Sequence, residues 1–197
     1  KCKPIFVFLL LCFSVMSVWG QEISEKQDIA VFNLSYYDWN IPNAALGMID
    51  EQIKGVFVSL GRFNVIGMNY RIGSENINAF IEKIREMKQQ NAVIPESVQL
   101  GREAFTEADF NKIVNSFLVV IPTVSYYGLS TDDSGDSEVN IEATFSIINI
   151  EEARTIAHFT VETTGIDEET QKAVKEAVDN IPRSEERRVG KECVSEC

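Results

Sequence analysis

Cysteine, histidine and basic residues are scarce once the two ends of the chain are set aside. The four cysteines lie within the first 12 or the last five of the 197 residues, and His158 is the only histidine. The central segment therefore has no means of forming a disulfide or a cysteine-ligated metal site. A Cys–His catalytic pair is excluded there as well. No GxSxG, HExxH, GxGxxG or phosphate-loop motif occurs, so no cofactor is predicted.

Long apolar runs are confined to the amino end. An apolar run at residues 5–15 follows two lysines, and residues 17–20 read Ser-Val-Trp-Gly, with small or branched residues at the two positions that a signal peptidase reads. This pattern predicts a secretory signal peptide over residues 1–20. The run is shorter than the roughly 18–20 residues that a membrane anchor needs. Cys12 follows a leucine, where a bacterial lipobox has a small residue, so lipid attachment is not predicted.

The carboxyl end has an unusual composition. Residues 183–193 read Arg-Ser-Glu-Glu-Arg-Arg-Val-Gly-Lys-Glu-Cys, which resembles the translation of a common sequencing adapter. We interpret residues 183–197 as an adapter-derived or disordered tail. On this interpretation the gene continues beyond Pro182, and the folded domain spans residues 21–182.

Basic charge is low in that domain. Of the chain's 18 basic and 30 acidic residues, the first 20 positions contain two basic ones and the tail contains four of each sign. Residues 21–182 therefore have 12 basic and 26 acidic side chains, a net charge of −14. Binding to a nucleic acid backbone needs clustered Lys and Arg, so a nucleic acid partner is excluded.

Apolar periodicity predicts alternating strands and helices. Glycine and a capping pattern mark several ends: Gly61 follows the first helix, Ser74 is expected to cap the second, and Thr106–Asp109 resembles a capping box. Residues 92–105 have no clear pattern, and Pro122 predicts a bulge or an unpaired edge in the third strand. The predicted strands are 28–34, 62–67, 116–125, 139–147 and 154–162, and the helices are 46–60, 74–87, 106–114 and 167–180.

This order predicts an α/β fold. Two strand–helix–strand crossovers come first and require parallel strands, whereas three consecutive strands with short connections form an antiparallel meander. We therefore expect a two-layer or three-layer sandwich with a mixed sheet of about five strands.

Four apolar phrases within this order indicate a family. They are Ile29-Ala-Val-Phe, Leu60-Gly-Arg-Phe-Asn-Val-Ile, Phe117-Leu-Val-Val-Ile-Pro and Phe145-Ser-Ile-Ile-Asn-Ile. Together with the element order, over residues 28–182, they resemble the periplasmic domain of the CsgG-like family. That family includes the curli secretion channel lipoprotein, lipoprotein activators of penicillin-binding proteins and, more loosely, the TolB amino-terminal domain.

The chain departs from the curli channel in one respect. The channel inserts long amphipathic hairpins that span the outer membrane, whereas here residues 128–138 alone join the third and fourth strands. A membrane-spanning strand needs about 9–11 residues, so no added pair fits. The resemblance therefore implies a periplasmic or outer-membrane-associated protein that is not itself a pore.

Two polar features of the sequence are weaker candidate sites. His158 lies on a predicted strand, where a hydrogen-bonded or solvated histidine is the usual finding. Asp132, Ser134, Asp136 and Glu138 alternate in a turn and could offer oxygens to Ca²⁺, but the EF-hand register is not met. We interpret this segment as a solvated hairpin turn and predict no metal site.

The candidate binding residues are aromatic. Tyr36, Tyr37 and Trp39 follow the first strand, and Tyr126 and Tyr127 follow residue 125, the predicted end of the third. If the two strands are parallel, both groups emerge at one edge of the sheet, where ligands of open α/β sheets bind. Tyr and Trp are also enriched at protein interfaces. The alternative is that these rings pack beneath their own loops.

The leading interpretation is an exported, non-enzymatic module that binds envelope proteins or associates with itself. Two alternatives stay open. One is a small-ligand-binding domain, which would need an enclosed apolar pocket. The other is a carboxylate-dependent hydrolase, which would need two facing carboxyl groups in a cleft.

Overall fold

A computed structural model describes residues 26–36, 41–90 and 94–181. The predicted signal peptide and tail lie outside these residues. None of the helices in the described ranges is long and apolar enough to cross a membrane. The elements in chain order are β1 (Gln27–Phe32), α2 (Asn43–Ser59), β2 (Phe63–Met68), η2 (Ser74–Asn76), α3 (Ile77–Gln90), β3 (Ser97–Leu100), β4 (Glu103–Thr106), α4 (Glu107–Asn115), β5 (Leu118–Thr131), β6 (Ser137–Asn149), β7 (Arg154–Asp167) and α5 (Thr170–Asp179).

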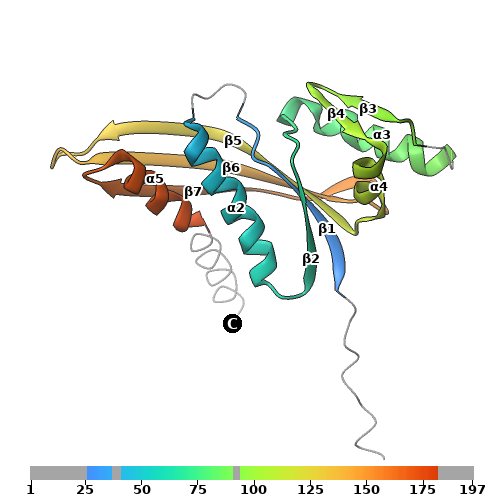
Figure 1. The fold of residues 1–197 in the computed structure, drawn as a ribbon, viewed down its shortest axis with the longest axis horizontal. Coiled ribbons are helices and arrows are strands. Elements are labelled where there is room, and N and C mark those ends of the chain that lie inside the picture. The colour runs from blue at the N-terminus through green and yellow to red at the C-terminus, as the bar shows by residue number, and fades with distance from the viewer. Residues whose placement is uncertain (1–25, 37–40, 91–93, 182–197) are drawn as a thin grey trace, which may run out of the picture.

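The main sheet has five strands in the order β2-β1-β5-β6-β7 (Figure 1). β1 is parallel to β2 and to β5, as the crossover connections require. β5, β6 and β7 form an antiparallel meander of strands 13 or 14 residues long. The predicted mixed α/β sheet is confirmed.

Helices cover both faces of this sheet, so the fold has three layers. α2 and α5 pack on one face, over Val31 of β1 and alternate apolar residues of β6. α3, α4 and the β3–β4 hairpin pack on the other face, over Phe32 and Val119. The two groups lie toward opposite ends of the long strands (Figure 1). Each end of the meander is therefore covered on a different face.

Aromatic rings fill the core beneath α3 and α4. Phe105 is fully buried and lies 6.0 Å from Phe32, 6.5 Å from Phe80 and 6.2 Å from Phe110, measured between ring centroids. The ring of Tyr70 is 4.4 Å from the same side chain. Edge-to-face and tilted contacts of this kind add to the free energy gained by apolar burial. Phe105 belongs to β4, so the small hairpin contributes the central ring of this core.

The sequence pattern did not predict that hairpin. Residues 97–100 and 103–106 form an antiparallel pair, with Val98 opposite Phe105. Each strand has only four residues, too few for alternation to stand out from a loop. The turn depends on Gly101, which has a positive φ of 58°, a conformation that glycine adopts without strain.

The third strand also differs from the prediction. β5 continues to Thr131 instead of ending at residue 125, and its bulge lies between Val124 and Tyr126 and not at Pro122. The carbonyl of Pro122 accepts a hydrogen bond from the Ser35 amide of the chain that follows β1, so its nitrogen faces β1 as well. The missing amide hydrogen therefore interrupts the pairing with β1 and leaves the pairing with β6 regular.

Three helix ends were misplaced by the prediction. Ser74 begins the 3-10 turn η2, which has no side-chain cap hydrogen bond, and α3 starts only at Ile77. α2 begins at Asn43, before its predicted start at residue 46, whereas its end at Ser59 agrees with the predicted termination at Gly61. α5 begins at Thr170 because β7 extends to Asp167. Helix ends are the least certain part of any assignment by pattern.

The predicted cap of α4 is confirmed, and it holds a perturbed carboxylate. The Thr106 hydroxyl accepts a hydrogen bond from the Asp109 amide at 3.1 Å. Lys112 and Tyr70 donate to the Asp109 carboxylate at 2.8 and 2.7 Å. These two hydrogen bonds, the one from Lys112 contributing most, lower the pKa of Asp109 from 3.8 to about 2. Desolvation by burial is the larger cause that raises the pKa of the Tyr70 hydroxyl, and its hydrogen bond to the Asp109 carboxylate raises that pKa further.

We expect this carboxylate to stabilise the fold at neutral pH and to lose that effect in acid. A lowered pKa gives stability that is present above the unfolded value, near 3.9, and is lost as the pH falls toward about 2. Asp109→Asn should cost about 1 kcal/mol at pH 6, because the side chain is 27% exposed and solvent screens part of the effect. The cost should shrink between pH 4 and pH 2. Urea unfolding at several pH values measures it, with Glu168→Gln on an exposed turn as the control.

Candidate functional site

The chain that follows β1 lies beside the middle of β5 and not beside its carboxyl end, because β5 continues to Thr131. Tyr126 and Tyr127 therefore lie within the strand, and the prediction that they emerge at its end is wrong. The Ser35 amide donates to the Pro122 carbonyl at 3.0 Å, and the Val124 amide donates to the Ser35 carbonyl at 2.8 Å. Tyr36, the next residue, is half-buried and packs against the core beneath α2 and α5. The guanidinium carbon of Arg71 lies 5.2 Å from the centre of its ring, within the range of a cation–π contact.

The two tyrosines of β5 point to opposite faces of the sheet. Tyr127 pairs with Ile141 and packs against the core on the helix-covered face, where burial raises the pKa of its hydroxyl. Tyr126 pairs with Glu142 and lies on the other face with 48% of its surface exposed. A Cβ built on Gly128 would lie 2.5 Å from the Tyr126 hydroxyl. The ring of Tyr126 therefore lies flat along the strand, over this glycine.

The described residues therefore divide the five candidate aromatic residues. Tyr36 and Tyr127 contribute to the core on one face, and Tyr126 lies on the opposite face. Tyr37 and Trp39 are outside the described residues. Whether any of them contacts a partner stays a prediction.

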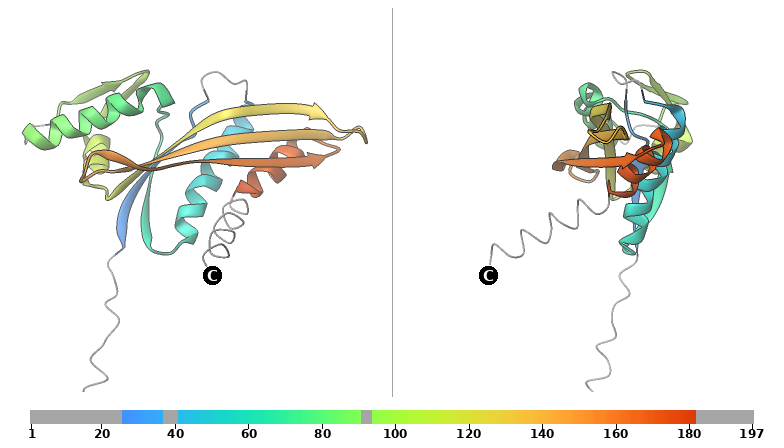
Figure 2. Two further views of the ribbon diagram at one scale, coloured as in Figure 1. Left: turned by 180° about the vertical axis from the view of Figure 1, so that it is seen from behind. Right: turned by 90° about the vertical axis from the view of Figure 1, so that its left-hand side faces the viewer.

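Tyr126 belongs to a polar surface that we call the open face. From behind, the three strands of the meander pass in front of α2 and α5 (Figure 2). Alternate residues of β6 face the helices and are buried, so the residues between them face outward. The open face consists of Thr123, Ser125, Tyr126, Gly128, Ser130, Glu138, Asn140, Glu142, Thr144, His158, Thr160, Glu162, Thr164 and the exposed Ile166.

Side-chain hydrogen bonds run across the open face from strand to strand. The Thr144 hydroxyl is 2.5 Å from the Ser125 hydroxyl and 3.1 Å from that of Thr160. The Thr164 hydroxyl donates to the Asn140 amide oxygen at 2.6 Å. Such cross-strand pairs hold side chains in place on a solvated sheet face. The open face is thus an ordered polar platform.

His158 lies at the margin of this platform. Its Nδ1 is 3.0 Å from the hydroxyl of Ser146 on the neighbouring strand, and the ring is exposed. The prediction of a hydrogen-bonded histidine on a strand face is confirmed.

The acidic turn between β5 and β6 uses one carboxylate for its own backbone. Asp132 accepts hydrogen bonds from the amides of Ser134 and Asp136, both at 2.9 Å, and Gly135 has a positive φ of 94°. This is a hairpin turn closed by an Asp side chain. Within the described ranges, no group of three or more His, Cys, Asp or Glu side chains is arranged to hold a metal ion.

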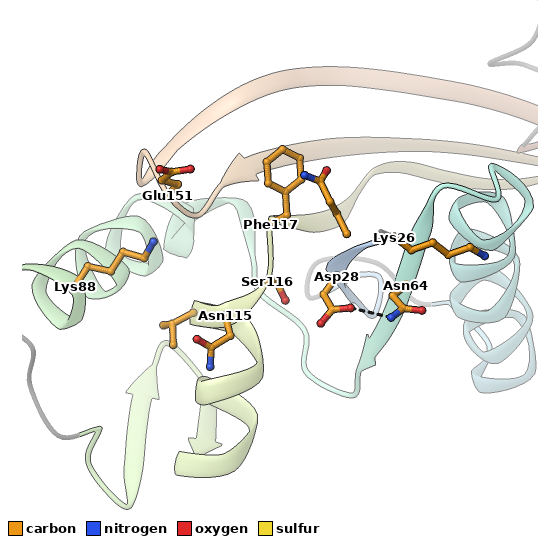
Figure 3. A pocket seen from close by; sticks show the side chains of 10 residues that line it. Lys26, Asp28, Asn64, Lys88, Asn115, Ser116, Phe117 and Glu151 are labelled. Carbon is orange, nitrogen blue, oxygen red and sulfur yellow. Dashed lines mark hydrogen bonds between the residues drawn. The ribbon is translucent and has the colours of Figure 1, made fainter. Parts of the chain in front are cut away.

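A groove of about 800 Å³ lies at the amino ends of β1, β2 and β5 (Figure 3). Its walls include Asp28 at the start of β1, Phe117 before β5 and Glu151 in the turn between β6 and β7. The Asn64 side chain donates a hydrogen bond to the Asp28 carboxylate at 3.0 Å.

A second, apolar cavity lies beneath α2 and the end of α5, next to the stacked rings of Phe145 and Phe159, and measures about 30 Å³.

The sequence pattern did not predict one buried charged cluster, which joins α2 to the loops after β1 and β2. Asp50 of α2 is 6% exposed, and its carboxylate accepts hydrogen bonds from the Leu34 amide at 2.8 Å and from Arg71 at 2.6 Å. Arg71 also donates to the Leu34 carbonyl. The pair joins α2 to the chain that follows β1 and β2. An acidic residue inside an apolar helix face was the available signal, because a buried charge requires a partner.

Neither a protein-family model nor a curated protein matches the sequence. Among solved structures, the hypothetical protein CT253 from Chlamydia trachomatis aligns with 83% of this chain and 95% of its own, at 9% identity and a TM-score of 0.50. Lipoprotein GNA1162 from Neisseria meningitidis aligns over 84% and 99%, at 13% identity and a TM-score of 0.46. The LpoB C-terminal domain from Escherichia coli aligns over 77% and 92%, at 10% identity and a TM-score of 0.35. At such low identity, the likeness to CT253 shows a common fold and says nothing of activity.

Proposed function

We propose that this chain is an exported, non-enzymatic module of the bacterial cell envelope, of the CsgG-like type, that acts by binding envelope proteins. The observation that supports this most is the open face. One face of the long meander is buried under α2 and α5, whereas no described helix covers the opposite face around Tyr126. On this proposal the protein acts through the shape and chemistry of that surface, in envelope assembly or secretion, and is not itself a pore.

The dimensions of the meander favour a binding role. Its strands have 13 or 14 residues, compared with five or six in an ordinary sheet. A surface of that length, held by cross-strand hydrogen bonds, loses little conformational entropy when a partner binds. Tyr126 supplies an exposed aromatic ring on it, and tyrosine is enriched at protein interfaces.

A small-ligand-binding domain is the weaker alternative. The apolar cavity of about 30 Å³ has room for roughly one water molecule, whereas ligand pockets measure about 300–1,000 Å³. The groove of about 800 Å³ is large enough, but it is open and its walls are mostly polar.

A carboxylate hydrolase is also less well supported. Asp28 and Glu151 line the same groove, but the Asp28 carboxylate is engaged by Asn64, and the two acidic residues come from separate elements, the start of β1 and the turn between β6 and β7 (Figure 3). Acid–base catalysis on a glycosidic bond needs two carboxyl groups that face a common substrate.

The proposal predicts a partner contact at position 126. A photo-cross-linking residue in place of Tyr126, in the full chain mixed with a bacterial envelope fraction, should give one discrete adduct of higher mass. The matched control is the same residue in place of Val58 of α2, which is 60% exposed on the other side of the sheet. Tyr126→Ala should also weaken capture of the cross-linked partner without unfolding the protein, because the side chain lies on the surface. Absence of an adduct at 126, or equal adducts at both positions, would contradict the proposal.

A further inference from the structure

Three side chains form a row across the open face. Tyr126 of β5 is directly opposite Glu142 of β6, and Glu142 is directly opposite Glu162 of β7. Directly paired residues on adjacent antiparallel strands have Cβ atoms about 4.5–5.5 Å apart. One tyrosine and two glutamates therefore occupy adjacent positions in one row, and the Tyr126 ring extends from this row along its strand over Gly128.

The pairing of the two glutamates opposes folding. Like charges directly opposite each other on neighbouring strands destabilise a sheet. Neither Glu142 nor Glu162 forms an ion pair with a residue in the described part of the chain. Glu138 is the other acidic residue on the open face, and none of the residues that form this face is Lys or Arg. The sheet therefore keeps a local repulsion that its own side chains do not relieve.

A destabilising pair of like charges is expected where a surface has a function. A cation supplied from outside would remove the repulsion, and the exposed ring beside the carboxylates restricts which cation fits. A guanidinium group is planar, forms paired hydrogen bonds with a carboxylate and stacks on a tyrosine ring.

We propose that the row of Tyr126, Glu142 and Glu162 binds an arginine side chain presented by a partner protein. This inference rests on the proposed function, because it specifies the chemistry of the partner that the open face receives. Charge complementarity is the main argument: the face carries three carboxylates and no Lys or Arg, and the partner surface is expected to be basic. The partner's guanidinium stacks on the Tyr126 ring over Gly128 and pairs with the neighbouring Glu142 carboxylate, and Glu162 on the next strand adds negative charge.

The test uses a hexa-arginine peptide with a fluorescent label, titrated against the full chain at low salt. Glu142→Gln together with Glu162→Gln should weaken binding about tenfold. The matched control, Glu96→Gln together with Glu107→Gln, removes the same charge from the β3–β4–α4 unit and should change binding less than twofold. Tyr126→Leu should weaken binding about two- to five-fold, whereas Tyr126→Phe, which keeps the ring, should retain it.

Two further measurements separate a specific site from general acidity. The Glu142→Gln, Glu162→Gln protein should melt about 1–2 °C higher than the unaltered chain, because the cross-strand repulsion is gone. Hexa-lysine should bind more weakly than hexa-arginine, since an ammonium group lacks the planar fork. Equal losses in the two double variants, or equal binding of the two peptides, would overturn the inference.

The inference and the proposed function fail in different ways. If the Tyr126 adduct with an envelope protein persists in the Glu142→Gln, Glu162→Gln chain at unchanged yield, the binding module stands and the arginine site is wrong. If no envelope adduct forms but hexa-arginine binding depends on both glutamates, the arginine site stands and the envelope-binding proposal is wrong.

Discussion

Gly165→Ala is expected to destabilise the protein by about 3 kcal/mol, a large part of the stability of an ordinary domain. A Cβ at this position would lie 2.0 Å from the Ala173 carbonyl oxygen and 2.4 Å from the Ala177 amide nitrogen. Both atoms belong to the backbone of α5, so no side-chain rotation relieves the clash. The helix has to move away from β7 by more than about 1 Å to restore ordinary contact distances of 3.4–4 Å.

That movement would loosen a closely packed core. Ala173 and Ala177 are completely buried, and α5 also places Val174, Val178 and Ile181 against the sheet. Closely packed interiors tolerate little displacement, because dispersion contacts weaken within an ångström. The small residues at 165, 173 and 177 are therefore what allows α5 to lie directly on β7.

Urea unfolding followed by circular dichroism measures the effect. Gly55→Ala in α2 is the matched control, since its new Cβ would meet no atom within 4 Å. Alanine is favoured over glycine inside a helix, so this variant should gain about 0.5–1 kcal/mol. If Gly165→Ala unfolds within about 0.5 kcal/mol of the unaltered chain, then α5 does not pack on β7 as described.

Asp50→Ala should cost about 3–5 kcal/mol, because it leaves the Arg71 guanidinium and the Leu34 amide without their shared acceptor. Two hydrogen bonds link the carboxylate to Arg71, at 2.6 and 3.2 Å, and a third links it to the Leu34 amide at 2.8 Å. Breaking a buried pair by removing one partner costs more than the pair contributes, since the remaining charge stays desolvated.

Two companion variants separate charge from hydrogen bonding. Asp50→Asn keeps an oxygen for the Leu34 amide but loses the charge, so its cost should fall between that of Asp50→Ala and zero. Glu51→Ala is the control on the same helix, because its carboxylate is 80% exposed and its pair with Lys54 lies at the surface. Surface pairs contribute little, and we expect a change below about 0.5 kcal/mol. A cost below about 1 kcal/mol for Asp50→Ala would show that the pair is not buried in solution.

Most of the architecture was predictable from local patterns. The apolar faces of α2, α3 and α5 recur at helical spacing, and alternation in β6 separates the buried residues from the polar ones. The capping box at Thr106 correctly marked the start of α4. These features depend on neighbours along the chain, which the sequence displays directly.

The candidate site was less predictable because it depends on register. A bulge next to Tyr126 places that ring on the open face and leaves its neighbour Tyr127 in the core. A shift of one residue exchanges the two faces of a strand, and nothing in the residues around position 125 shows where the shift occurs. The pairing of Glu142 with Glu162 likewise appears only when β6 and β7 are aligned.

The sequence alone was sufficient for the mixed α/β fold, the order of the main-sheet strands and the helices along the chain, and the scarcity of cysteine, histidine and basic charge, because each follows from composition or from short-range periodicity. The three-dimensional arrangement was needed for the contact of α5 with Gly165, the Asp50–Arg71 pair and the row of Tyr126, Glu142 and Glu162. Each of these joins residues 8 to 36 positions apart, from Gly165–Ala173 to Tyr126–Glu162. Their proximity is a consequence of strand register and helix packing, which involve the whole chain at once.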